Sequence, residues 1–367
     1  MAKNKNRQRE PVADKIPLVS VIIPMYNAAR FISQTLESLL YQTMTDFEVI
    51  IVDDCSTDNS VEVVKNFAER FGGRLHIIEL SENSGTPEVP RNLAIKFSRG
   101  KYLAFLDSDD LFTKTALEEL STLAEVYQAD IVHNDEFYFF LDEKFKSATT
   151  KKLLNINHTV IKCNPNSPRL PNPIFAPDNF AERMQLWLNF DFHWATWALF
   201  CRRNFWVTNQ IEFPIMPVAG DVLTNFKCLC LARKLLRVPN IFYIYRERMD
   251  SIAHNSFDLE KYFCRLLNDL NIGFNELDKF MSKIAFFDEH PDYRYAVLNW
   301  FFERIIRDAL KLRAAYEQIH AFSLNPLVKK EFHPDDAAFA SYLFDTVNNQ
   351  RLQIMQLQRE LAKFQQQ

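Results

Sequence analysis

The sequence predicts an α/β fold: a mostly parallel sheet flanked by helices, followed by a helical C-terminal extension. Short runs of β-branched and apolar residues, such as VSVIIP and FEVIIVDD, alternate with stretches whose apolar residues recur at helical spacing. This alternation is typical of a parallel sheet with helices packed on its faces. The length of 367 residues and the hydrophobic content of 47% allow a large core.

Five apolar runs are short enough to be buried strands. They occupy residues 18–24, 47–54, 74–80, 101–107 and 129–135. Four stretches with apolar residues at a helical period separate these runs or follow them closely. The predicted helices cover residues 29–42, 60–71, 87–100 and 113–128. Prolines open the third helix, and we expect it to end at Gly100.

The second half of the chain has a different pattern. Residues 141–180 are rich in proline, and aromatic residues crowd residues 181–206. A helix is predicted over 219–234, entered through Gly220 and Asp221, and a strand over 241–248. Residues 258–322 have the pattern of amphipathic helices.

Near the C-terminus, residues recur in steps of four and three, which is the spacing of a heptad seam. The seam positions are Leu343, Val347, Gln350, Ile354, Leu357, Leu361 and Phe364. We expect a short coiled coil through which the chain forms a homo-oligomer. The alternative is a single helix docked on the body of the protein.

The composition argues against several classes of function. A formal net charge of −4 does not indicate a nucleic-acid binder. The six glycines form neither G-x-G-x-x-G nor G-x-x-x-x-G-K-[ST], the usual phosphate-binding loops. The six cysteines contain no C-x-x-C pair and fit thiols in a reducing compartment. Without a signal-peptide core or a long apolar run, we expect a cytoplasmic protein, and peripheral contact with the inner face of the cell membrane stays open.

Acidic residues follow two of the predicted strands. Asp53 and Asp54 end the second strand, and Asp107, Asp109 and Asp110 end the fourth. The carboxyl ends of parallel strands lie along one edge of a sheet, where ligands bind in such folds. A divalent cation, Mn²⁺ or Mg²⁺, would stabilise the second cluster, because these ions bind carboxylates together with substrate phosphates. The alternative is a turn that caps the next helix.

Four sequence blocks resemble the family 2 glycosyltransferases of the GT-A fold, which are inverting enzymes. The blocks are VSVIIPMYN, SLLYQTMTDFEVIIVDDCSTDNS, PRNLAIKFSRGKYLAFLDSDD and the later AGD. Residues 18–135 match over nearly their whole length, residues 190–254 match more loosely, and the rest of the C-terminal part does not match.

The resemblance implies a role for residues in each block. The implied nucleotide-sugar contacts are Pro24, Tyr26, Asn27, Asp53, Asp54, Arg91, Asn92, Asp107 and Ser108. Among these, Pro24 and Tyr26 would pack on the base, and Asp54 would accept its N–H. Asp109 and Asp110 would hold the metal. Asp221 would be the general base that takes a proton from the acceptor; as the alternative, it would cap its helix.

Acceptor and phosphate contacts are expected in the second half. His193 and Trp194 lie in the aromatic stretch, and rings of this kind stack on sugars. Arg246, Arg248 and His254 lie where the family often has a basic segment closing over the phosphates. The alternatives are core aromatic residues and a solvated charge run. The family usually has small residues before the Arg-Asn pair, whereas this chain has a segment with Glu88 and Pro90. The identity of the transferred sugar is therefore not predicted.

The resemblance divides the chain into five expected parts. They are a disordered basic tail (1–16), a nucleotide-sugar-binding half (17–135), an acceptor-binding half with the base (136–255), a helical extension (256–340) and a coiled-coil helix (341–367). The implied reaction moves a sugar, most readily from a UDP-sugar, to a glycan or lipid-linked glycan in bacterial surface polysaccharide or lipopolysaccharide assembly. A nucleotidyltransferase and a non-catalytic coiled-coil scaffold are the alternatives, and the missing glycine fingerprint disfavours a dehydrogenase.

Overall fold

A computed structural model describes most of the chain, and its residues fall into two units. The described residues are 16–142, 149–155, 159–162, 170–189, 191–216, 219–248 and 259–317. Unit 1 comprises Met1–Ala176, Ala195–Glu212 and Leu231–Arg246, and unit 2 comprises Pro177–Trp194, Phe213–Cys230 and Glu247–Gln367. Residues 136–246 are therefore shared between the two units. The predicted heptads, residues 343–364, lie outside the described part of the chain.

Unit 1 contains one ten-stranded sheet in the order β3-β2-β1-β4-β9-β6-β10-β5, with β7 paired to β6 and β8 to β10. The strands are β1 (Val19–Met25), β2 (Phe47–Asp53), β3 (Leu75–Glu79), β4 (Tyr102–Phe105), β5 (Leu111–Phe112), β6 (Ile131–Leu141), β7 (Thr159–Lys162), β8 (Ile174–Phe175), β9 (Leu199–Arg202) and β10 (Leu235–Glu247). Strands β1 and β2 are buried along their whole length, as continuous apolar runs predict.

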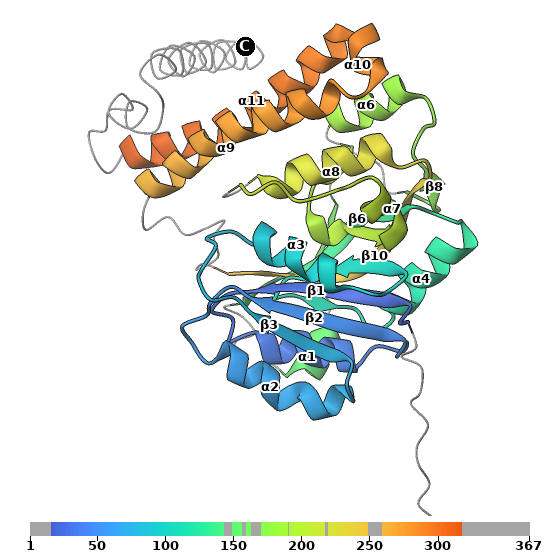
Figure 1. The fold of residues 1–367 in the computed structure, drawn as a ribbon, viewed down its shortest axis with the longest axis vertical. Helices are drawn as coiled ribbons and strands as arrows, with labels where there is room; N and C mark the ends of the chain where they lie inside the picture. The colour runs from blue at the N-terminus through green and yellow to red at the C-terminus, as the bar shows by residue number, and fades with distance from the viewer. Residues whose placement is uncertain are drawn as a thin grey trace, which may run out of the picture. The chain divides into compact units, whose positions relative to one another are not determined.

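The helices of unit 1 connect and cover these strands. They are α1 (Ile32–Leu40), α2 (Ser60–Phe71), α3 (Glu88–Phe97), α4 (Ala116–Val126), α5 (Thr150–Leu154) and α7 (Arg203–Thr208), with a 3₁₀ turn at Thr196–Ala198. Figure 1 shows α1 and α2 on one face of the strands β1 to β3 and α3 on the other face. The predicted α/β sheet flanked by helices is thereby confirmed.

The sheet is mixed rather than mostly parallel. Strands β3, β2, β1 and β4 pair in parallel, but β9 pairs antiparallel with both β4 and β6. Strand β9 carries no strand pattern that could have predicted it, because its residues lie in the aromatic stretch. The short strands β5, β7 and β8 were missed as well, since strands of two to four residues carry almost no periodic signal.

The prediction that Gly100 ends the third helix is wrong. Helix α3 ends at Phe97, and its C-cap Ser98 is extended. Gly100 instead lies against β1: a Cβ atom there would be 2.5 Å from the Ser20 nitrogen and 2.8 Å from the Val19 carbonyl carbon. The glycine therefore permits a close approach of two backbones where β4 begins.

Unit 2 is helical among its described residues. Its helices are α6 (Phe180–Leu188), α8 (Gly220–Leu231), α9 (Leu259–Met281), α10 (Ala285–Glu289) and α11 (Pro291–Glu317). Trp187 of α6 packs on Phe226 of α8 and Trp300 of α11, with ring centroids 5.2 and 4.8 Å apart. Most of the aromatic excess in this part of the sequence is therefore core. The predicted helix at 219–234 and the amphipathic helices after 258 are present.

Candidate functional site

The acidic loop, residues 107–110, connects β4 to β5 in unit 1. Strand β5 pairs antiparallel with β10, so that Phe112 lies opposite Tyr243. This pairing brings the side chains near the end of β10 to the acidic loop, although more than 130 residues separate them in sequence. The loop itself begins where the parallel strand β4 ends, at the edge where an α/β sheet binds ligands.

Asp110 is the buried member of the acidic loop, with a relative exposure of 1%. Its Oδ2 accepts a hydrogen bond from the Tyr243 hydroxyl at 2.6 Å, and its Oδ1 accepts one from the Arg246 backbone N–H at 2.7 Å. Burial raises the pKa of the Asp110 carboxyl well above its ordinary value, and the neighbouring charges of Asp109 and Asp107 add to this. Both oxygens of Asp110 therefore bind groups of the protein, and its role as a metal ligand stays a prediction.

Arg246 is also buried, with a relative exposure of 3%. Its Nε donates to the Asp109 carbonyl at 2.7 Å, its Nη1 to Asp142 at 3.0 Å and its Nη2 to Gln34 at 2.5 Å. The guanidinium lies 5.0 Å from the ring centroids of two phenylalanines, Phe31 and Phe140. Burial lowers the pKa of Arg246, and the Asp142 carboxylate opposes that shift. Arg246 therefore binds groups of the protein through Nε, Nη1 and Nη2, and its contact with phosphates stays a prediction.

Asp107 and Asp109 are the partly exposed members of the acidic loop. Asp107 Oδ1 accepts a hydrogen bond from Arg91 Nη2 at 2.7 Å, and its side chain is 31% exposed. Ser108, between them, is partly exposed, and its carbonyl accepts a hydrogen bond from the Thr35 hydroxyl at 3.0 Å. The loop therefore has two partly exposed aspartates, and its backbone is bound by Thr35.

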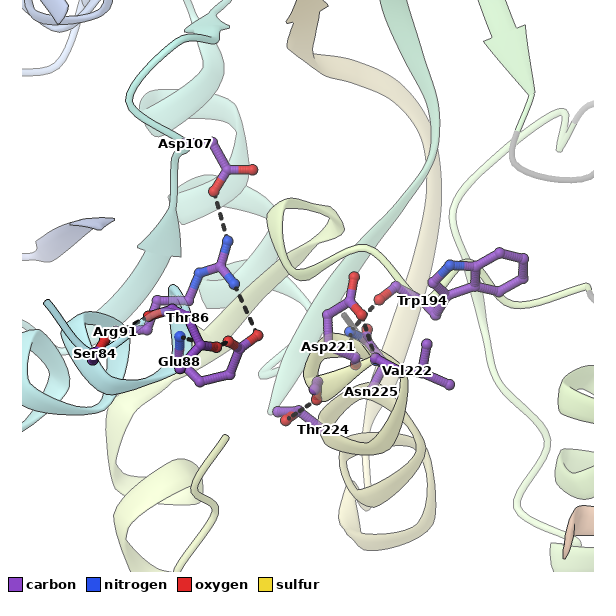
Figure 2. A network of polar contacts seen from close by, with 12 residues as sticks. Ser84, Thr86, Glu88, Arg91, Asp107, Trp194, Asp221, Val222, Thr224 and Asn225 are labelled. Carbon is purple, nitrogen blue, oxygen red and sulfur yellow. Dashed lines mark hydrogen bonds and ion pairs between the residues drawn. The ribbon is translucent and has the colours of Figure 1, made fainter. Parts of the chain in front are cut away.

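Arg91 lies between two carboxylates, as Figure 2 shows. Its Nη1 is 3.6 Å from Oε1 of Glu88, whose other oxygen accepts a hydrogen bond from Thr86. Glu88 is buried and begins α3, so the residue that departs from the family pattern is an ion-pair partner of Arg91. Asn92, next in the helix, is partly exposed.

The loop after β1 holds the residues expected to contact the base. Pro24 is buried within β1, whereas Tyr26 has 49% of its surface exposed. Asn27 has a positive φ of 47°, and its Oδ1 accepts a hydrogen bond from the Thr57 N–H at 2.8 Å. Asn27 therefore joins this loop to the loop after β2, and the contact of Tyr26 with a base stays a prediction.

Asp53 and Asp54 are both buried at the end of β2. Asp53 accepts hydrogen bonds from the backbone N–H and hydroxyl of Ser56, at 2.9 and 2.5 Å. Asp54 Oδ1 accepts one from the Ser84 N–H at 2.9 Å. Both acids therefore bind groups of the loops that follow β2 and β3, while the roles that the resemblance implies for the acid at this position stay predictions.

A divalent metal fits the donor chemistry of the acidic loop. Asp107 and Asp109 supply hard carboxylate oxygens with partial exposure. Within the described residues, no group of three or more His, Cys, Asp or Glu side chains is arranged to hold a metal ion. Mg²⁺ and related ions commonly bind through one or two carboxylates together with substrate phosphates, so two carboxylates suit a metal that arrives with a diphosphate.

Asp221 lies in unit 2, in the first turn of α8, and is partly exposed. Its Oδ1 accepts a hydrogen bond from the Val222 N–H at 2.8 Å. The Asn225 side-chain amide donates to the carbonyls of Asp221 and Trp194, at 2.9 and 2.8 Å (Figure 2). Since α8 begins at Gly220, Asp221 is inside the helix rather than its cap. The buried Asp269 of α9 accepts the Ala219 N–H at 2.6 Å and so fastens the same end of α8.

The remaining predicted contacts lie in unit 2. His193 and Trp194 are partly exposed and their rings stack, with centroids 5.5 Å apart and planes 12° from parallel. The Arg304 guanidinium lies 5.0 Å from the Trp194 ring centroid. Arg248 is partly exposed, and His254 lies outside the described residues.

Sequence reasoning missed the residues that hold the acidic loop from behind. They lie in three widely separated segments of the chain, and each is an ordinary residue of a predicted helix, of a strand or of a strand end: Gln34 and Thr35, Asp142, and Tyr243. Their common function follows only from strand pairing. The alternation of tyrosines in YIYRER was the one available signal, because it indicated which side chains share a face of β10.

No helix in the described ranges combines the length and apolarity that crossing a membrane requires.

Comparisons with known proteins agree on one family. The family model described as glycosyl transferase family 2 matches residues 20–206, just over half of the chain. The putative teichuronic acid biosynthesis glycosyltransferase TuaG of Bacillus subtilis is 48% identical over 103 residues, which are 28% of this chain and 40% of TuaG. The uncharacterized glycosyltransferase EpsJ of Bacillus subtilis is 29% identical over 239 residues, 65% of this chain and 63% of EpsJ. The chain thus spans less than two thirds of the length of these relatives.

Among solved structures, TarS 1–349 of S. aureus in complex with UDP-GlcNAc has a TM-score of 0.50 and 23% sequence identity. The match covers 79% of this chain and 83% of that chain, and at this identity it shows the fold alone. The fold therefore agrees with the GT-A expectation. On the family match over residues 20–206, the chain belongs to glycosyl transferase family 2.

Proposed function

We propose that this protein transfers a sugar from a nucleotide-sugar to a hydroxyl group of a glycan or lipid-linked glycan, with inversion at the anomeric carbon. A UDP-sugar is the favoured donor, as the family resemblance implies. The relative named as a teichuronic acid biosynthesis glycosyltransferase supports bacterial surface polysaccharide assembly as the context. The observation that carries the proposal is the acidic loop: two partly exposed carboxylates at the end of a parallel strand, within the segment that the family model matches.

Each of the candidate site residues has a separate role in the proposed reaction. Asp221 is the proposed general base: it accepts the proton of the acceptor hydroxyl while that oxygen bonds to the anomeric carbon. The bond from this carbon to the diphosphate oxygen breaks, and the nucleoside diphosphate leaves. Asp107 and Asp109 would hold Mn²⁺ or Mg²⁺, which supplies positive charge to the departing diphosphate. Tyr26 would pack on the base, and the His193–Trp194 pair would stack on the acceptor.

Nucleotide release from a panel of nucleotide-sugars tests the proposal. The assay would run with Mn²⁺, with Mg²⁺ and with a chelator, on the wild type and on Asp109→Ala and Asp221→Ala. We expect one donor to be consumed, with loss of turnover in the chelator and in Asp109→Ala. Asp221→Ala should reduce kcat by at least about 100-fold while leaving the donor KM nearly unchanged, because a general base acts on the chemical step.

Asp288→Ala is the matched control, because its side chain is 64% exposed on α10. This variant should behave as the wild type. Absence of turnover and of binding for every donor, with and without metal and in the presence of polysaccharide acceptors, would remove the enzymatic proposal. Turnover that persists in the chelator would remove the metal from it and leave the transferase reaction standing.

A further inference from the structure

The backbone of the acidic loop is held by three side chains, which we call the loop clamp: Thr35, Tyr243 and Arg246. The Thr35 hydroxyl binds the carbonyl of Ser108, as described above. The Tyr243 oxygen accepts the Asp107 N–H at 3.2 Å and its hydroxyl donates to Asp110. Arg246 binds Asp110 through its backbone and the Asp109 carbonyl through its side chain. Every residue of the four-residue loop is therefore bound by the clamp.

Arg246 is also held by contacts outside the acidic loop. Its guanidinium lies 5.0 Å from the ring centroids of both Phe31 and Phe140, and it is ion-paired with Asp142, which also pairs with Arg30. An arginine that contacts two aromatic rings and is paired at its end has little rotamer freedom left to lose. The hydrogen bond to the Asp109 carbonyl consequently restrains the backbone at the residue proposed to bind metal.

The loop clamp binds mainly the backbone of the acidic loop. Its hydrogen bonds to the loop go to backbone groups and to the buried carboxylate of Asp110. Hydrogen-bonded groups behind a metal ligand orient it, and their loss commonly costs 10- to 100-fold in metal affinity.

We infer that Arg246 is a positioning residue: together with Tyr243 it holds the acidic loop in its binding conformation before metal and donor arrive. Binding then does not have to order the loop, which would otherwise weaken the affinity. This inference rests on the proposed function where it treats Asp107 and Asp109 as ligands. It differs from a purely structural role, which would lower stability and leave metal affinity unchanged in molecules that are folded.

The test measures two quantities on folded protein: the affinity for Mn²⁺ in the presence of UDP, by electron paramagnetic resonance of free Mn²⁺, and hydrogen exchange of the amides of residues 106–112. Arg246→Lys keeps the charge but cannot make the separate Nε and Nη bonds. We expect its Mn²⁺ affinity to fall by about 10- to 100-fold and the loop amides to exchange at least about tenfold faster.

Arg237→Lys is the matched control, because Arg237 lies on the same strand β10, is also buried and pairs with Asp135 instead of the loop. It should lose stability without losing Mn²⁺ affinity. If Arg246→Lys does not fold, Tyr243→Phe replaces it, since this change removes only the hydroxyl that binds Asp107 and Asp110. Where the wild type binds Mn²⁺, unchanged affinity or unchanged loop exchange in the folded variant, or equal effects from Arg237→Lys, overturns the inference.

The two proposals fail in different ways. If the wild type binds Mn²⁺ no better than Asp109→Asn, the metal part of the proposed function fails, and the exchange rates alone decide about the clamp. Faster exchange of residues 106–112 in Arg246→Lys than in Arg237→Lys then supports the clamp, and equal exchange refutes it. If the wild type binds Mn²⁺ but Arg246→Lys binds it equally well, the proposed function stands and the positioning role is refuted.

Discussion

Substitution of Gly100 tests the account of how β4 joins the sheet. A Cβ atom at this position would lie 2.5 and 2.7 Å from the nitrogen and Oγ of Ser20 and 2.8 Å from the Val19 carbonyl carbon. Two of these three atoms are backbone of β1, which cannot move without shifting the sheet. Overpacking of this kind costs about 1–3 kcal/mol.

The same substitution disturbs a hydrogen-bond network. The Gly100 N–H donates to Ser20 Oγ at 2.8 Å, and the Ser20 hydroxyl donates to the buried Glu48 at 2.6 Å. Loss of these two bonds adds about 1 kcal/mol each. We therefore expect Gly100→Ala to lower the free energy of unfolding by about 3–5 kcal/mol.

Gly72 provides the matched control for Gly100. It ends α2 with a φ of +57°, and nothing lies within 4 Å of the position of a Cβ atom. Gly72→Ala should cost about 1 kcal/mol from the left-handed backbone, and Gly72→Asn should cost less, because Asn tolerates this region. Gly100→Asn should be at least as costly as Gly100→Ala, since the obstacle there is steric.

Urea unfolding of the four variants measures these differences. If Asn restores stability at position 100 as it does at position 72, Gly100 acts through its backbone conformation and the close-approach account is wrong. If Gly100→Ala costs no more than Gly72→Ala, the contact between β1 and the start of β4 is looser than described.

Two further predictions concern Asp135 and Asp269. Burial, which by itself raises the pKa of Asp135, is outweighed by His133 and Arg237, so that the pKa lies below its ordinary value. Ionised Asp135 therefore contributes stability above pH 4 or so, and this contribution is lost as the pH falls through the lowered folded-state pKa. In urea titrations between pH 6 and about pH 3, Asp135→Asn should flatten the acid limb of the stability curve, and an unchanged slope would contradict this assignment. Asp269→Ala should reduce kcat about tenfold or more with little change in donor KM, because the Ala219 N–H at the start of α8 loses its acceptor. Asp269→Asn keeps an acceptor oxygen, so its kcat should lie between those of the wild type and Asp269→Ala. A change confined to KM would exclude a role of Asp269 in positioning the proposed base.

The sequence by itself determined the parallel half of the sheet and its helices. Strands β1 and β2 are continuous apolar runs that are buried on both faces, and their periodicity is a local property. The acids after β2 and β4 could be placed at one edge because parallel strands all end there. The family blocks added the roles of Asp107, Asp109 and Asp221 as expectations.

Only the tertiary structure decided which charged residues near the acidic loop are partly exposed and which are buried. Asp110 has the same local sequence context as Asp109, yet pairing of β5 with β10 buries it against Tyr243 and Arg246. In the sequence, Arg246 is a basic residue at the end of a predicted strand. The hydrogen-bond partners of its side chain lie 104 to 212 positions away along the chain. The physical reason is that local periodicity specifies an element and its buried face, whereas the partner of a buried charge depends on which distant strand is placed beside it.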